Sequence, residues 1–195
     1  EAAAHAPADG YTILLGNFGF AVTPSLHEKL SYDVVRDVSP VSLISNGSLA
    51  LLVHPSSPVK SVKELLALAK AQPGKLNFGS SGGGSSSNLG ALLFRSMTGV
   101  QITGINYQGG GPMLVGLMSK ELDIVFVSIA AAMPQIKSSQ LCIIGVSTLQ
   151  RSRTLPDIPT ISEAGVKGYE LNSWYGVVVP SKTPQAVINK INGLV

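Results

Sequence analysis

Short apolar runs alternate with helical patterns along most of the chain, and this alternation constrains the fold more than any other feature of the sequence. The runs Ile124–Ser128 and Cys142–Thr148 are apolar almost throughout, which is typical of strands buried on both faces of a sheet. The alternation therefore predicts an α/β fold. The chain has 195 residues, of which 45% are hydrophobic and 13% charged. That is enough for one large domain or two small lobes with a substantial core.

Turn and capping signals set the expected boundaries. A capping box opens a helix at Ser61, and Pro73-Gly74 ends it. Thr183 as N-cap and Pro184 at the first helical position open the last helix. The other expected elements are strands over 11–15, 41–44, 49–54, 76–79, 102–107 and 174–179, a polar loop at 16–19, and helices over 88–98 and 112–120.

Charge and metal-binding side chains argue against several classes of function. The net charge is only +3, and the 14 Lys and Arg residues are scattered, so no nucleic-acid partner is expected. His5, His27 and His54 are widely spaced and lack Cys or paired carboxylate partners, so no metal or cofactor is expected. Cys142, the single cysteine, is expected to be a small buried hydrophobe. No apolar run reaches the roughly 20 residues of a membrane span, and no signal peptide is recognisable.

The Gly/Ser loop, residues 80–87, is the most informative stretch, because it joins a predicted strand to a predicted helix. Backbone N–H groups and the helix dipole make such a junction an anion site, glycines let a ligand approach closely, and serines add hydroxyl donors. The loop fails the dinucleotide fingerprint, because Ser87 replaces the third glycine, and it lacks the Gly-Lys-Ser/Thr ending of a P-loop. A purely structural tight turn stays open as an alternative. The predicted ligand-binding residues are Ser80, Ser81, Gly82, Gly83, Gly84, Ser85 and Ser86.

The same loop also matches the nucleophile elbow of serine hydrolases, with Ser81 at its centre. In that fold the acid and the histidine follow the serine in the chain, whereas all three histidines here precede Ser81. No enzyme activity is expected, and a hydrolase that uses Ser81 is kept as an alternative.

Candidates outside the loop carry weaker signals. Asn17 and Phe18 follow the first predicted strand, on the carboxyl-end side where α/β folds bind ligands, and are predicted to contact the ligand. Asp123 opens a buried strand and is expected to be a surface or capping acid. Trp174 and Tyr175 open another strand and are expected to lie in the core.

Motifs spread over nearly the whole chain together resemble one known family. The most specific is Leu155–Gly168, and the others include Ala8-Asp9-Gly10-Tyr11-Thr12, Pro55-Ser56-Ser57-Pro58, Pro73-Gly74-Lys75-Leu76, the Gly/Ser loop, Tyr107-Gln108-Gly109 and Trp174-Tyr175-Gly176. They are similar to motifs of the Bug family, the extracytoplasmic solute-binding receptors of tripartite tricarboxylate transporters.

The resemblance implies a two-lobed periplasmic-binding-protein (Venus-flytrap) fold, with residues 1–57 and 169–195 in lobe one and 58–168 in lobe two. It also implies that an N-terminal strand and helix, with a second carboxylate loop, and the C-terminal end lie outside this chain. The ligand would be a carboxylate in the interlobe cleft, held without an arginine clamp, with Val127 and Ser128 nearby. Val127 stands where many members carry Asp, which favours di- or tricarboxylates or an aromatic acid over amino acids.

These features predict a periplasmic protein that captures a small carboxylate by hinge closure and presents it to the membrane subunits of a tripartite tricarboxylate transporter. We expect the protein to be a monomer. A binding module that serves as a sensor co-receptor would have the same sequence features and is kept as a second alternative.

Overall fold

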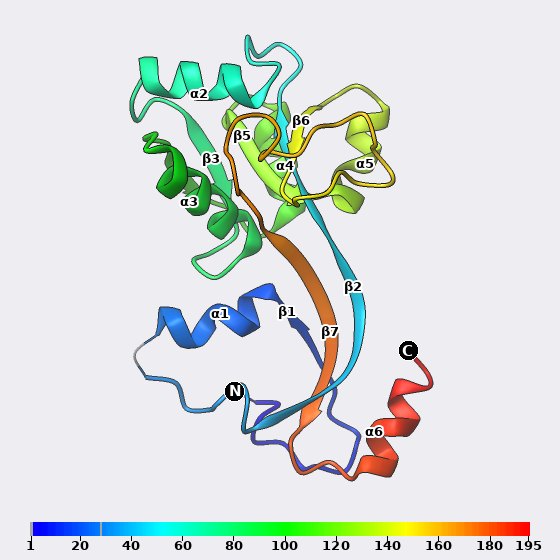
Figure 1. Ribbon diagram of the computed structural model, residues 1–195. Coiled ribbons are helices and arrows are strands. Elements are labelled where there is room, and N and C mark those ends of the chain that lie inside the picture. Colours follow the sequence, from blue (N-terminus) through cyan, green and yellow to red (C-terminus); the bar gives the residue numbers. More distant parts are fainter. Residues whose placement is uncertain (1, 28) are drawn as a thin grey trace. The chain divides into compact units, whose positions relative to one another are not determined.

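The computed structural model describes residues 2–27 and 29–195, which divide into two compact units (Figure 1). Unit 1 contains the residues up to Asn46 together with Ser173–Val195, and unit 2 contains Gly47–Asn172. The chain enters unit 2 within the long strand β2 (Val38–Val53) and leaves it at the start of β7 (Asn172–Pro180). Both connections between the units are therefore strands rather than flexible loops.

Unit 2 is built on a mixed sheet in the order β6-β2-β5-β3-β4. β4 and β5 run parallel to β3, whereas β2 runs antiparallel to both β5 and β6. β3, β4, β5 and β6 therefore all point in one direction. The strands are β3 (Asn77–Ser80), β4 (Thr103–Asn106), β5 (Ile124–Ser128) and β6 (Cys142–Val146), and the helices are α2 (Val62–Ala71), α3 (Ser86–Thr98), α4 (Gly110–Met118) and α5 (Ile129–Lys137).

The alternation of side chains along β2 divides the core of unit 2 between the two faces of its sheet. Ala50 and Leu52 are buried in a cluster that includes Met113 of α4 and Ala132 of α5. Leu49 and Leu51 are equally buried and point to the opposite face, because successive side chains of a strand alternate. Cys142 is only partly buried at the start of β6, so the prediction of a buried cysteine is wrong.

An aromatic cluster fixes the last part of unit 2 against α3. Phe94, Phe126 and Tyr169 are almost completely buried, with ring centroids 6.3 Å apart in each pair. The Tyr169 hydroxyl donates a hydrogen bond to the carbonyl oxygen of Gly90 at 2.9 Å. A Cβ on Gly90 would lie 3.3 Å from Phe126 and from the Tyr169 hydroxyl, so only glycine fits here without movement of these neighbours.

The units do not divide where the predicted lobes do. The sequence suggested boundaries at 57/58 and 168/169, and the structure divides the chain at 46/47 and 172/173. The buried part of β2 accounts for the first difference, because residues 49–53 form core of unit 2. Tyr169 accounts for the second, because its ring lies in the aromatic cluster of that unit.

The first strand and the loop after it also differ from the prediction. β1 is Leu14–Asn17, and the expected loop at 16–19 is replaced by the start of α1 (Phe18–Leu26). Asn17 explains the helix, because its side-chain oxygen accepts a hydrogen bond from the backbone N–H of Phe20 at 3.3 Å and so caps the first turn.

Three further elements depart from the sequence-based expectation. β2 is one continuous strand, although two shorter strands were expected in its place. α5 was not expected, and Ser128 starts it directly after β5 by accepting a hydrogen bond from the backbone N–H of Ala131 at 3.3 Å. α6 (Gln185–Asn192) begins one residue late, because Pro184 is its N-cap and the Thr183 hydroxyl does not cap it.

In unit 1, β1 pairs antiparallel with β7, and β7 lies between β1 and β2. The register places Leu14 opposite Val178 and Asn17 opposite Tyr175. Asn17 therefore lies at the end of this sheet where β7 begins. Within the described part of the chain, every helix is too short or too polar to cross a membrane.

Candidate functional site

Three strand-to-helix junctions of unit 2 lie at one edge of its sheet. β3, β4 and β5 are adjacent and parallel, so their last residues, Ser80, Asn106 and Ser128, lie at the same edge. α3, α4 and α5 each begin within a few residues of these strand ends. The positive ends of three helix dipoles are therefore gathered at the carboxyl edge of the sheet, where α/β folds bind ligands.

The segments that form this edge contain no charged side chain. Residues 76–94, 101–119 and 124–136 lack Asp, Glu, Lys and Arg altogether. The charges of unit 2 that flank them, such as Lys75, Lys120 and Asp123, stand before the strands, at the opposite edge of the sheet. Asp123 accepts a hydrogen bond from the backbone N–H of Asn77 at 2.7 Å there, which confirms that it caps the backbone. An anion at the carboxyl edge would therefore meet dipoles rather than a formal charge.

The serine hydroxyls of the Gly/Ser loop form a directional chain of hydrogen bonds. Ser85 Oγ donates to the carbonyl oxygen of Gly82 at 2.7 Å, which uses its single proton. Ser87 Oγ must then donate to Ser85 Oγ, at 3.0 Å. Ser81 Oγ in turn donates to Ser87 Oγ, also at 3.0 Å. Ser85 Oγ also accepts from the backbone N–H of Asn88 at 3.2 Å and so caps α3.

This chain changes the expected part of the serines. The hydroxyl protons of Ser81, Ser85 and Ser87 are spent inside the loop, so the expectation that each serine offers a hydroxyl donor is wrong for Ser81 and Ser85. Ser80 Oγ accepts from the backbone N–H of Gly82 at 3.2 Å and keeps its own proton. Ser86 Oγ has no partner among the described residues. The serines chiefly shape the loop.

Four backbone N–H groups of the loop have no acceptor among the described residues: those of Gly83, Gly84, Ser86 and Ser87. The carbonyl oxygen of Gly83 is held by the side-chain amide of Asn88 at 2.9 Å, which fixes this peptide. Gly82 has a φ of +105°, a conformation that a residue with a side chain rarely adopts. The loop therefore presents unused N–H donors on a backbone that its own side chains hold in place.

Val127 and Ser128 end β5 at the same edge. Val127 is only 7% exposed and belongs to the core cluster that packs against α4. A Cβ on Gly110, the first residue of α4, would lie 3.2 Å from Val127 Cγ2, so the two backbones approach closely. Ser128 caps α5. The structure thus brings these two residues to the edge formed by the loop, and their contact with a ligand stays a prediction.

The other predicted residues belong to unit 1. Asn17 is exposed and caps α1, and Phe18 is the first residue of that helix. Their role in binding stays a prediction. Trp174 is half-buried and Tyr175 is 39% exposed, so the expectation that both lie in the core is wrong.

Catalytic and metal-binding readings find little support in these contacts. Ser81 Oγ is hydrogen-bonded to the hydroxyl of Ser87, which cannot act as a general base. His54, which belongs to unit 2, is instead hydrogen-bonded through Nδ1 to Ser56 Oγ at 2.8 Å. Among the described residues, no group of three or more His, Cys, Asp or Glu side chains is placed to hold a metal ion.

Several residues at this edge were not identified from the sequence. Ser87 lies in the predicted loop, but its role as the branch point of the hydroxyl chain depends on a folded turn. Ser48 and Thr148 contact each other through their hydroxyls at 2.6 Å, where β2 and β6 meet the same edge. The triple glycine 109–111 was read as a loop, whereas Gly109 is the N-cap of α4 and two of these glycines begin the helix. A glycine run directly after a strand was the available signal.

Comparison with known proteins places these features in a family. The family model described as "Tripartite tricarboxylate transporter family receptor" (TctC) matches residues 1–194. Among solved structures, Rpa4515 of Rhodopseudomonas palustris with adipate is 36% identical, with a TM-score of 0.92 over 98% of this chain and 64% of that one. MatC from the same organism, with bound malate, is 30% identical, with a TM-score of 0.89 over 98% and 65% of the two chains. The periplasmic binding protein BugD is 31% identical, with a TM-score of 0.89 over 97% and 63%.

These likenesses confirm the predicted periplasmic-binding-protein fold and the resemblance to the Bug receptors. The chain spans less than two thirds of the length of the curated relatives it matches, for example 59% of the first and 56% of the second. The family model nevertheless covers all but the last residue. This chain therefore belongs to the tripartite tricarboxylate transporter receptor (TctC) family.

Proposed function

We propose that the protein is an extracytoplasmic receptor that binds a small di- or tricarboxylate, or an aromatic acid, at the carboxyl edge of the unit 2 sheet. One observation carries the proposal: unpaired backbone N–H groups of the Gly/Ser loop lie at a helix N-terminus, in a region without charged side chains. A carboxylate is the complementary group, because it accepts several hydrogen bonds and is favoured at the positive end of a helix dipole.

The available donors are sufficient in energy. A hydrogen bond to a charged group contributes about 1.5–3 kcal/mol, so three or four amides supply roughly 5–12 kcal/mol before the cost of ordering the ligand. Micromolar binding requires about 8 kcal/mol. A receptor of this design therefore needs no arginine to hold its ligand, and the hydrogen-bonded serines keep the amides oriented in advance.

The choice of ligand class follows from the nature of the edge and from the relatives. Val127 leaves β5 without a carboxylate at its end, so a ligand ammonium group has no partner there. Two structural relatives, Rpa4515 and MatC, contain adipate and malate. Both observations favour plain dicarboxylates over amino acids for this chain. Delivery to transporter membrane subunits is part of the proposal, and a sensor co-receptor would bind its ligand in the same way.

A thermal-shift screen over mono-, di- and tricarboxylates tests the proposed function. At a concentration 100 times its Kd, a ligand adds about 2.7 kcal/mol to the free energy of unfolding, which raises the Tm of a chain of this size by roughly 5–11 °C. Adipate and malate are the first compounds to test, with the corresponding amino acids as controls. If no carboxylate raises the Tm while the protein is folded, the proposal is wrong.

Gly83 offers a sharper test of the site itself. Nothing lies within 4 Å of the position of a Cβ on Gly83, and its φ is not in the left-handed region, so a side chain fits without strain. In Gly83→Trp, the indole should deny the ligand two amides, which costs about 3–6 kcal/mol or roughly 10²–10⁴-fold in Kd. Gly83→Ala is the matched control and should bind nearly as the wild type does in calorimetry. Equal affinity of Gly83→Trp and wild type would exclude the loop from binding.

A further inference from the structure

Unit 1 contains a polar cavity of about 400 Å³ that the carboxylate site does not use. Three segments line it: residues 4–8 before β1, the turn that contains Ser31, Arg36 and Asp37, and Pro180–Lys182 after β7. Because β1 and β7 are antiparallel, these segments lie at the end of the unit 1 sheet opposite to Asn17. The cavity is therefore separate from the predicted contacts of unit 1 with the carboxylate ligand.

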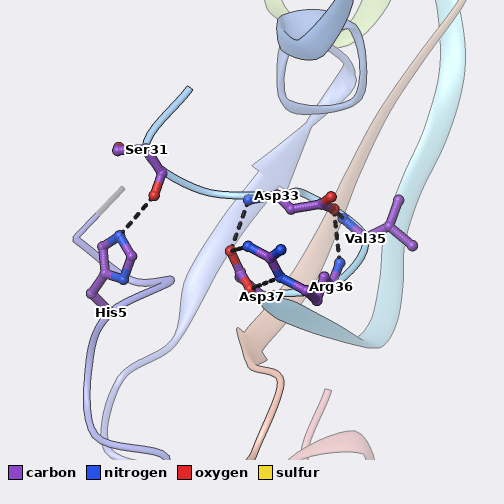
Figure 2. Close-up of polar contacts among 6 residues, drawn as sticks. All are labelled: His5, Ser31, Asp33, Val35, Arg36 and Asp37. Atoms are coloured by element: carbon purple, nitrogen blue, oxygen red, sulfur yellow. Dashed lines mark hydrogen bonds and ion pairs between the residues drawn. The ribbon is translucent and has the colours of Figure 1, made fainter. Parts of the chain in front are cut away.

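The turn that forms one wall is rigid and already neutralised. Arg36 donates to both carboxylate oxygens of Asp37, at 2.8 and 3.0 Å, and the backbone N–H of Asp33 donates to Asp37 at 2.8 Å. Figure 2 shows this carboxylate between the Asp33 backbone and the Arg36 guanidinium, with His5 beside Ser31. The hydrogen bonds from Arg36 lower the pKa of Asp37 to about 2, so its negative charge is permanent at neutral pH and already matched by one cation.

Cationic side chains then remain in excess around the cavity. The ion pairs among the described residues are Arg36–Asp37 and Arg151–Glu163, so Lys182 has no acidic partner in that part of the chain. His5 adds a further imidazole, whose Nε2 is bonded to the carbonyl oxygen of Ser31 at 3.1 Å. The lining side chains thus carry two positive charges and one negative charge with His5 neutral.

We propose that this cavity is a second ligand site and that it binds a tetrahedral oxyanion such as sulfate or phosphate. Donors reach it from three separate segments: Lys182 after β7, His5 near the start of the chain, and the part of the Arg36 guanidinium that Asp37 does not engage. An anion with four oxygens satisfies donors from several directions, whereas a planar carboxylate matches a single fork.

Calorimetric titration of the full chain with sodium sulfate at low ionic strength tests this inference, because low salt preserves interactions at a partly open site. The wild type should show saturable binding of one sulfate. Lys182→Ala should weaken that binding about tenfold, as expected for the loss of one charge-assisted hydrogen bond. Lys190→Ala is the matched control, because it removes the same charge from exposed α6 outside the cavity and should change the Kd less than about twofold.

Further arms separate this site from the carboxylate site. Sulfate should shift the NMR signals of the His5 ring, should bind Gly83→Trp with unchanged affinity, and should not be displaced by adipate. The inference is overturned by sulfate binding only at crystallisation-like concentrations, by equal effects of Lys182→Ala and Lys190→Ala, or by competition between sulfate and adipate. Failure of the carboxylate screen alone leaves these results intact, so the two proposals fail separately.

Discussion

Replacing Ser87 with alanine removes the branch point of the hydroxyl chain and probes how the loop is held. Ser87 Oγ lies 3.2 Å from the backbone nitrogen of Ser81, which donates to it, and 3.0 Å from the hydroxyls of Ser81 and Ser85. Ser87 is only 4% exposed, so water does not readily replace the lost group. A buried hydrogen-bonding group left unpaired costs about 1–3 kcal/mol. For a chain of this size, that loss lowers the Tm by roughly 2–12 °C.

The same substitution should weaken carboxylate binding. Without Ser87, the backbone between Ser81 and Ser85 loses its internal support, and the free amides are no longer oriented in advance. We expect the Kd to rise about tenfold, which corresponds to about 1.4 kcal/mol. Urea denaturation measures the first effect and calorimetry with adipate measures the second.

Ser96→Ala is the matched control for this experiment. Ser96 lies on the same helix, α3, and is exposed, so its loss should change the free energy of unfolding by less than about 0.5 kcal/mol and leave the Kd unchanged. If Ser87→Ala behaves like Ser96→Ala in both assays, the hydroxyl chain does not hold the loop and the account of the site is refuted.

Two other predictions concern the scaffold. Tyr169→Phe removes the buried hydrogen bond to Gly90 and should lower the free energy of unfolding of unit 2 by about 1 kcal/mol in urea, without changing the Kd of the carboxylate; no change in stability would contradict the role given to this hydroxyl. Asp37→Asn should flatten the acid limb of the stability curve. Hydrogen bonds from Arg36 lower the pKa of Asp37 to about 2, so its contribution is complete above the unfolded-state pKa of about 3.9 and is lost as the pH falls through 2. Thermal melts between pH 5 and pH 2 should therefore differ between wild type and variant, and parallel curves would exclude the effect.

The strand-to-helix junctions could be predicted from sequence because their signals are local. The run of small residues after Phe78 and the continuous apolar run of β5 indicate a buried α/β sheet without further information. The position of the Gly/Ser loop at a helix start follows from the same local pattern. The family motifs then supplied the fold.

The parts that could not be predicted depend on three-dimensional packing. The break at Pro55–Pro58 was taken as a lobe boundary, but β2 enters unit 2 before it, because Leu49–Val53 pair with both β5 and β6. Tyr169 belongs to unit 2 only through rings that lie distant in sequence. The direction of each serine hydroxyl likewise depends on which acceptors the folded turn brings within reach, so the sequence indicated hydroxyl donors where the structure uses them internally.

The central claim is that free backbone amides, and not a cationic side chain, hold the carboxylate. An ¹⁵N–¹H NMR titration of the protein with adipate observes these groups directly. The account predicts that the amide protons of Gly83, Gly84 and Ser86 move downfield together, with one shared Kd, while amides at the opposite edge, such as that of Asp123, stay in place. Unchanged loop amides, with saturable shifts centred on a lysine or arginine side chain instead, would contradict it.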